Sequence, residues 1–151
     1  MVCCEGVYTG TGDRLVTRVL YIEDDEDSVY MLKLRFELLE SFEILVAENG
    51  EEGCSKALSE QPGVIIMDLD MPVVDGWEAT RRLKSNPATK AIPIIALSAH
   101  ALSDSRDKAL AVGCDEFEMK PVDLEQLIKK VQLLANRRPI NEDTGTAAAS
   151  R

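Results

Sequence analysis

Carboxylates follow two short apolar stretches of this chain, each at the point where the stretch ends. Val64-Ile65-Ile66-Met67 runs directly into Asp68, and Val19-Leu20-Tyr21-Ile22 runs into Glu23 and Asp24. Such stretches are typical of strands that are buried on both faces of a parallel sheet. Ligands of open α/β sheets bind outside the carboxyl ends of the strands, so Asp68 is well placed for chemistry. The alternative is that Asp68 forms a turn and that Glu23 and Asp24 only begin a helix.

A hydroxyl and an ammonium group follow two later apolar stretches. Ser98 ends the stretch that begins at Ile92, and Lys120 comes directly after Glu116-Phe117-Glu118-Met119. If the strands are parallel, these side chains and the three carboxylates gather at one edge of the sheet. Converging carboxylates repel one another, and a hard divalent cation with oxygen ligands, such as Mg²⁺, would relieve that repulsion. A carboxylate nucleophile beside a metal and a lysine is equipped for phosphoryl transfer onto Asp68.

The elements that must position these side chains alternate regularly along the chain. We expect strands over residues 19–22, 42–47, 64–67, 92–98 and 116–120, and helices over residues 29–39, 51–60, 77–86, 103–112 and 124–135. The second helix should turn Cys54, Ala57 and Leu58 inward, and Asp123 should cap the last helix. Strand followed by helix, five times over, predicts an α/β fold with a five-stranded parallel sheet and helices on both of its faces.

Length and charge narrow the range of functions. The chain has 151 residues, which suits one domain with a sizeable core. Its net charge of -10 argues against direct nucleic-acid binding, which needs an excess of lysine and arginine, and suits a cation site or a basic partner. No apolar stretch is long enough to cross a membrane, and the first residues lack the order of a secretory signal, so we expect a cytoplasmic protein.

Residues 1–17 and 136–151 are expected to be tails around a domain that spans residues 18–135. The first segment has several glycines and threonines without a sustained period, and the last is polar and rich in alanine. The four cysteines show no C-x-x-C spacing, so reduced thiols are expected. A lipid or metal site at the adjacent Cys3 and Cys4 is the weaker alternative.

Four motifs in order resemble the receiver domain of two-component response regulators, over residues 18–135. The acidic pair of that family matches Glu23-Asp24, although Asp24-Asp25 is the more obvious doublet, because the pair follows the last apolar strand residue. The family's phospho-accepting pattern Asp-x-x-Met-Pro-x-x-Asp-Gly matches Asp68 to Gly76, its switch hydroxyl matches Ser98, and its Lys-Pro pair matches Lys120-Pro121.

This resemblance implies a flavodoxin-like (βα)5 fold with strand order 2-1-3-4-5 and a function in two-component signal transduction. A histidine kinase or a histidine phosphotransfer protein would donate a phosphoryl group to Asp68. Glu23, Asp24, Asp68 and the backbone carbonyl of Asp70 would hold Mg²⁺. The resemblance also implies a cis peptide bond before Pro121.

The switch implied by the family would act through Ser98 and Phe117. Phosphorylation would draw Ser98 and the lysine toward Asp68 and repack the face of the fourth helix, last strand and last helix, which binds a downstream protein. Many relatives carry tyrosine where this chain has Phe117, so its movement would depend on packing alone; the alternative is an ordinary strand aromatic. The side chain of Asp70 occupies a position through which the family adjusts phosphoryl lifetime. His100 is interpreted as a loop or helix-start residue near this face, and a catalytic base is the weaker alternative.

Two other functions compete with a signalling switch. Asp68-Leu69-Asp70 also resembles the first motif of haloacid-dehalogenase-type phosphohydrolases, with Asp68 as nucleophile, but those enzymes begin with the nucleophile strand and need a further acidic pair. A receiver relative that is never phosphorylated usually lacks an acid, the hydroxyl or the lysine, and this chain has them all. We therefore expect a stand-alone switch rather than a conventional enzyme. The cognate kinase, the target and dimerisation through the switch face stay open.

Overall fold

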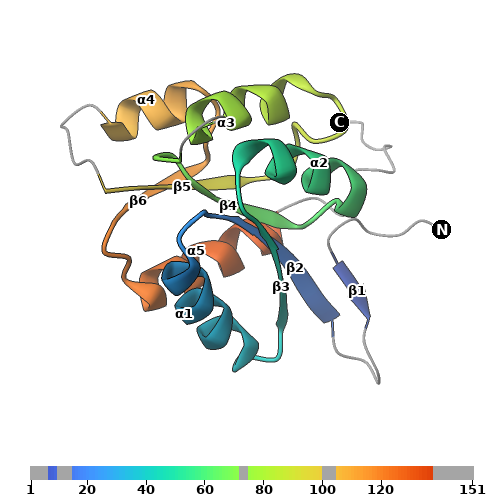
Figure 1. Ribbon diagram of the computed structural model, residues 1–151. Helices are drawn as coiled ribbons and strands as arrows, with labels where there is room; N and C mark the ends of the chain where they lie inside the picture. The colour runs from blue at the N-terminus through green and yellow to red at the C-terminus, as the bar shows by residue number, and fades with distance from the viewer. Residues whose placement is uncertain (1–6, 10–14, 72–74, 100–104, 138–151) are drawn as a thin grey trace.

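A computed structural model describes residues 7–9, 15–71, 75–99 and 105–137 (Figure 1). Its strands are β1 (Val7–Thr9), β2 (Leu15–Ile22), β3 (Phe42–Ala47), β4 (Val64–Asp68), β5 (Ile94–Ser98) and β6 (Glu116–Met119). Its helices are α1 (Glu26–Glu37), α2 (Gly50–Glu60), α3 (Gly76–Ser85), α4 (Ser105–Ala111) and α5 (Leu124–Arg137). Strand and helix alternate from β2 onward, as the sequence predicts.

Five parallel strands form the sheet in the order β3-β2-β4-β5-β6. This order is 2-1-3-4-5 when the parallel strands alone are numbered, so the predicted flavodoxin-like topology is confirmed. The carboxyl ends of β2, β4, β5 and β6 therefore lie along one edge. Among the described residues, no helix is long and apolar enough to span a bilayer.

A sixth strand lies outside the predicted set. β1 pairs antiparallel with the first residues of β2, in the register Val7↔Thr17 to Thr9↔Leu15. The expectation that residues 1–17 form only a tail is therefore wrong for the two segments that make this pairing. The reason is physical: three paired residues give too short an alternation for a local strand signal, and the pairing depends on a partner strand. At the other end, α5 continues two residues beyond the predicted boundary at 135.

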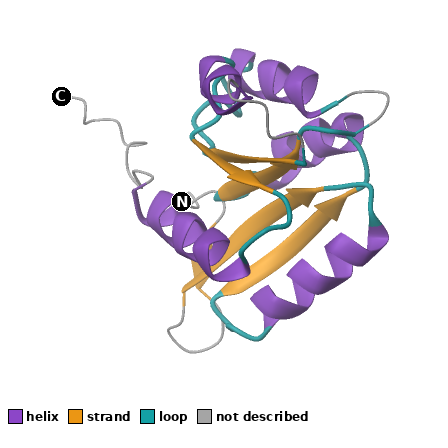
Figure 2. Cartoon of the chain, turned by 90° about the vertical axis from the view of Figure 1, so that its left-hand side faces the viewer, coloured by secondary structure: helices purple, strands orange, loops and turns teal. Residues whose placement is uncertain are grey.

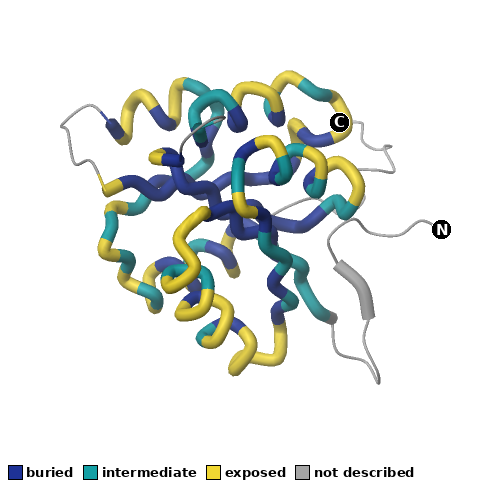
Figure 3. Tube along the Cα trace, viewed as in Figure 1, coloured by how far each residue is buried: buried dark blue, intermediate teal, exposed yellow. Residues whose placement is uncertain are grey.

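The two faces of the sheet carry separate apolar cores, and successive residues of each central strand point to opposite sides. On β2, Leu20 and Ile22 pack under α2, α3 and α4, whereas Val19 and Tyr21 pack under α1 and α5. Figures 1 and 2 show helices on both sides of the sheet, and Figure 3 shows its central strands as the most deeply buried part of the chain. All five residues of β4 and of β5 are buried. Continuous apolar sequence in these strands follows from burial on both faces.

Short polar side chains begin the helices that follow the strands. Asp25, Asn49 and Asp75 each accept a hydrogen bond from a backbone N–H in the first turn of α1, α2 and α3. Helix α1 therefore begins at Glu26, three residues before the apolar stripe that predicts it. The expected inward direction of Leu58 is wrong, since 49% of that residue is exposed. The inward direction predicted for Ala57 is confirmed, because this residue is fully buried, and Cys54 is half-buried.

Candidate functional site

Asp68 is the last residue of β4 and lies at the centre of the carboxyl edge of the sheet. It is 2% exposed, and its Oδ1 accepts a hydrogen bond of 3.0 Å from the backbone N–H of Asp70. The start of α3 lies directly against the end of this strand. A Cβ on Gly76 would be only 2.4 Å from the carbonyl oxygen of Asp68. Only glycine allows so close an approach of two backbone segments. The Asp-Gly pair at 75–76 thus provides a helix cap and this contact.

Three carboxylates meet beside this strand end. Glu23, Asp24 and Asp68 each offer an oxygen atom, and these atoms lie within 4.8 Å of one another. Glu23 is 2% exposed, whereas Asp24 faces solvent. The Lys120 ammonium lies 3.1 Å from Glu23 Oε1 and 3.4 Å from Asp68 Oδ2. Lys120 therefore contacts two of the three acids, and an all-oxygen donor set with surplus negative charge fits Mg²⁺.

Burial and neighbouring charges change the pKa values of Glu23 and Lys120. Burial, together with the hydrogen bond and charge of Asp68, raises the pKa of Glu23 to about 7, although Lys120 opposes this. Burial lowers the pKa of Lys120, but the charges of Asp68 and Glu23 outweigh burial and raise it overall. The lysine is therefore charged at neutral pH, while ionisation of the buried Glu23 carboxyl group is costly.

Tyr21 is a member of this cluster that the motifs did not identify. Its hydroxyl donates a hydrogen bond of 3.0 Å to Glu23 Oε1, the oxygen that also faces Lys120. Burial, and then the neighbouring charge of Glu23, raise the pKa of this phenol, so it stays a donor. The signal was present in the sequence, because Tyr21 precedes Glu23 by two residues and strand side chains two apart share a face.

Ser98 ends β5, the strand beside β4, but its hydroxyl faces Asp70. Ser98 Oγ lies 3.3 Å from Asp70 Oδ2 and 3.4 Å from Oδ1. The backbone N–H of Ala99 donates a hydrogen bond of 2.8 Å to the same Oδ2. The structure thus places Ser98 at the predicted edge of the sheet, and it gives the side chain of Asp70 contacts that the sequence alone did not reveal.

Phe117 and the Lys-Pro pair occupy the next strand and its exit. Phe117 is 8% exposed and belongs to the core beneath α2, α3 and α4. The Lys120-Pro121 peptide bond is cis, as the resemblance implies. His100 and the Cys3-Cys4 pair lie outside the described residues.

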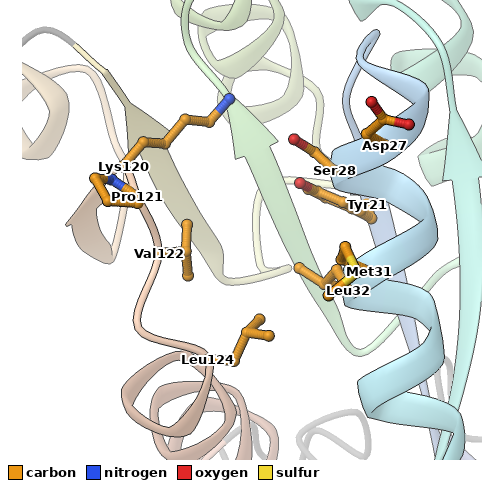
Figure 4. A pocket seen from close by; sticks show the side chains of 9 residues that line it. All are labelled: Tyr21, Asp27, Ser28, Met31, Leu32, Lys120, Pro121, Val122 and Leu124. Carbon is orange, nitrogen blue, oxygen red and sulfur yellow. The ribbon is translucent and has the colours of Figure 1, made fainter.

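A pocket of about 290 Å³ opens next to this site, between α1 and the segment that enters α5. Figure 4 shows side chains of α1 on one side and those of residues 120–122 and 124 on the other. Apolar side chains of Met31, Leu32, Val122 and Leu124 line it, and Lys120 is shared between the pocket and the carboxylate cluster. The pocket therefore adjoins the carboxylate cluster through the side chain of Lys120.

Comparisons with known proteins agree on one family. The model of the response regulator receiver domain matches residues 19–132. The chain is 33% identical over 116 residues to Protein PilH of Pseudomonas aeruginosa, covering 77% of this chain and 95% of PilH. It is 39% identical over 112 residues to hybrid signal transduction histidine kinase G of Dictyostelium discoideum, covering 73% of this chain and 3% of that kinase.

Solved structures give the same result. The receiver domain of the sensor histidine kinase PA1611 from Pseudomonas aeruginosa, whose crystal structure has a magnesium ion coordinated in the active-site cleft, superimposes with a TM-score of 0.73 at 26% identity. The match covers 80% of this chain and 98% of that domain. Several of the curated regulators that match are longer, and this chain spans about half of their length.

Proposed function

The chain belongs to the family of response regulator receiver domains, and from this premise we propose that it accepts a phosphoryl group on Asp68. The observation that carries the proposal is the position of Asp68: a buried carboxylate at a strand end, flanked by two further acids and by the Lys120 ammonium. Receivers are signalling switches rather than conventional enzymes. The family match gives no support to the phosphohydrolase alternative.

The transfer itself is a displacement at phosphorus. A carboxylate oxygen of Asp68 forms a new P–O bond, while the P–N bond of a phosphohistidine donor breaks and the departing imidazole takes up a proton. Lys120, within 3.4 Å of Asp68 Oδ2, offsets negative charge as the phosphoryl group arrives. The hydrogen bond from the Asp70 amide orients the other oxygen.

Magnesium is the cofactor that this donor set fits. Glu23, Asp24, Asp68 and the backbone carbonyl of Asp70 would hold it. A bound Mg²⁺ supplies positive charge to the three carboxylates and to the phosphoryl oxygens. Tyr21 and Lys120 both contact Glu23 Oε1, and in this way they fix the direction of a buried ligand.

The donor and the target are proteins in this proposal. A histidine kinase or histidine phosphotransfer protein would supply the phosphoryl group, and the apolar pocket that shares Lys120 with the site supports docking of a protein surface there. Ser98 and Phe117 would carry the switch to the face formed by α4, β6 and α5, where a downstream protein binds. Both residues lie on strands that end at, or next to, the carboxylate cluster.

Intact mass spectrometry after incubation with Mg²⁺ and acetyl phosphate tests this function. The wild-type chain should gain one phosphoryl group, and it should gain none when the metal is removed with EDTA. The variant Asp68→Asn keeps the size of the side chain and removes the nucleophile, so it should stay unmodified. Modification of both chains at another residue, or sustained release of phosphate without an adduct, would contradict the proposal.

A further inference from the structure

The carboxylate of Asp70 links the loop after β4 to the loop after β5. Its Oδ2 accepts a hydrogen bond of 2.8 Å from the Ala99 amide and lies 3.3 Å from the Ser98 hydroxyl. The backbone N–H of the same residue binds Asp68 Oδ1 at 3.0 Å. Asp70 therefore contacts Asp68 through its main chain and the end of β5 through its side chain.

The two donors that Asp70 engages lie beside Asp68. Asp68 is paired with Leu97 in the parallel register of β4 and β5, so Ser98 and Ala99 are the next residues past that pairing. Neighbouring strands lie about 4.8 Å apart, which brings a group attached to the Asp68 carboxylate close to both donors. A phosphoryl group carries about two negative charges and three acceptor oxygens, so it would compete for the same donors.

We propose that the Asp70 carboxylate is a placeholder that holds the Ser98 hydroxyl and the Ala99 amide until a phosphoryl group on Asp68 takes them over. The inference rests on the proposed function, since it requires Asp68 to be the acceptor. Asp70 is a positioning residue in this scheme, because it acts through Ser98 and Ala99. The exchange is driven in one direction, because the new phosphoryl charge attracts the two donors and repels the exposed Asp70 carboxylate.

The placeholder makes the unphosphorylated state more stable and so opposes phosphorylation. Removing it should favour any group that needs the two donors. Each hydrogen bond to a charged group contributes substantially to affinity. We therefore expect the variant Asp70→Ala to bind beryllium fluoride, a mimic of the phosphoryl group, about tenfold more tightly than the wild type does at saturating Mg²⁺. The variant Asp70→Asn retains one acceptor oxygen, so its affinity should lie between those of the wild type and Asp70→Ala.

The unliganded protein gives the first test. In a ¹⁵N–¹H spectrum without Mg²⁺ or phosphoryl mimic, the Ala99 amide should shift in Asp70→Ala, because it loses a charged acceptor at 2.8 Å. Glu78→Gln is the matched control, since it removes one acidic charge from α3, where Glu78 pairs with Arg81 and Arg82. It should leave the Ala99 amide unshifted. If the Ala99 amide does not shift in Asp70→Ala, the placeholder proposal is wrong, whatever is observed on phosphorylation.

Titration with beryllium fluoride gives the second test. In the background Ser98→Ala, where one of the two donors is missing, the gain from Asp70→Ala should be smaller than in the wild type. Equal affinities of Asp70→Ala and Asp70→Asn would overturn the inference, because loss of charge alone would then explain the change. If the wild type neither binds the mimic nor accepts a phosphoryl group, the proposed function fails; if it does both and Asp70→Ala binds no more tightly, only the placeholder fails.

Discussion

The two ends of the parallel sheet use charge in opposite ways. At the amino end of β5, the Lys84 ammonium lies 3.4 Å from Asp115 Oδ2 and also donates to the carbonyl oxygen of Ile92 at 2.8 Å. Asp115 Oδ2 in turn accepts a hydrogen bond of 2.9 Å from the N–H of Ile94. One positive and one negative group are matched there, and each also satisfies backbone atoms at the start of the strands.

At the carboxyl end of the sheet, the acidic and basic side chains are not matched in this way. Three acids meet there, and the Lys120 ammonium contacts the two that are buried, Glu23 and Asp68. Burial and repulsion raise the pKa of Glu23 to about 7, which shows that its charged form is disfavoured. The comparison teaches that a cation and an acid are matched at the start of β5, whereas surplus negative charge collects at the carboxyl end, where a cation and a phosphoryl group are expected to bind.

The largest effect is expected from a substitution that tests how tightly the carboxyl end of the sheet is packed. The variant Gly76→Ala places a Cβ 2.4 Å from the Asp68 carbonyl oxygen and 2.5 Å from the Leu69 Cα, which are backbone atoms without room to move. We expect the free energy of unfolding to fall by about 3 kcal/mol. Urea denaturation followed by circular dichroism measures it. If Gly76→Ala leaves the free energy of unfolding unchanged, the carboxyl end of the sheet is loosely packed.

The next effect tests the matched pair at the amino end. The variant Asp115→Ala leaves the Ile94 amide and the Lys84 ammonium without this acceptor, and the expected loss of unfolding free energy is about 2 kcal/mol. Asp115→Asn is the matched control, because it removes the charge and keeps an acceptor for the amide. It should cost clearly less than alanine. If the two variants are equally destabilised, the charge pair rather than the backbone hydrogen bond is what stabilises this end.

The sequence predicts much of this molecule because strand ends and turns carry local signals. Asp68, Ser98 and Lys120 were predicted at one edge of the sheet from the point at which apolar stretches stop, and the register of β4, β5 and β6 bears out that placement of the strands. Because the strands are parallel, all of their carboxyl ends lie at the same edge of the sheet. The roles of these residues in phosphoryl transfer stay predictions.

Other features depend on contacts that no local pattern encodes. Strand β1 exists only through its pairing with the start of β2. The direction of the Asp70 side chain depends on a residue 28 positions away, and that of Lys120 on a carboxylate 97 positions away. Helical spacing predicts that Leu58 points inward with Cys54 and Ala57, yet 49% of this residue is exposed. Spacing defines which face a side chain is on; the neighbouring elements decide how far that face is covered.

The smallest effect has the opposite sign, and it sharpens the comparison most. Removing a charge from the surplus end should stabilise the fold when Mg²⁺ is absent. The variant Glu23→Gln keeps an acceptor for the Tyr21 hydroxyl and relieves repulsion with Asp68, although it weakens the contact with Lys120. At pH 8 and in EDTA, we expect the free energy of unfolding to rise by about 1 kcal/mol. Thermal unfolding at fixed pH measures this gain.

The pH dependence of that gain follows from the raised pKa of Glu23, which is about 7 in the folded chain against an ordinary value of 4.5. Between these values the folded state holds a proton that the unfolded chain has released, so unfolding releases a proton and stability falls as pH rises through this window. The advantage of Glu23→Gln should therefore be absent near pH 4 and complete above pH 7. The surface variant Glu78→Gln should show no such window. Added Mg²⁺ should stabilise the wild type more than Glu23→Gln, because a ligand that binds the folded state through this carboxylate raises stability by mass action. A gain that is the same at pH 4 and pH 8 would mean that Glu23 is not ionised at a cost, and the contrast between the two ends of the sheet would then depend on Asp24 and Asp68 alone.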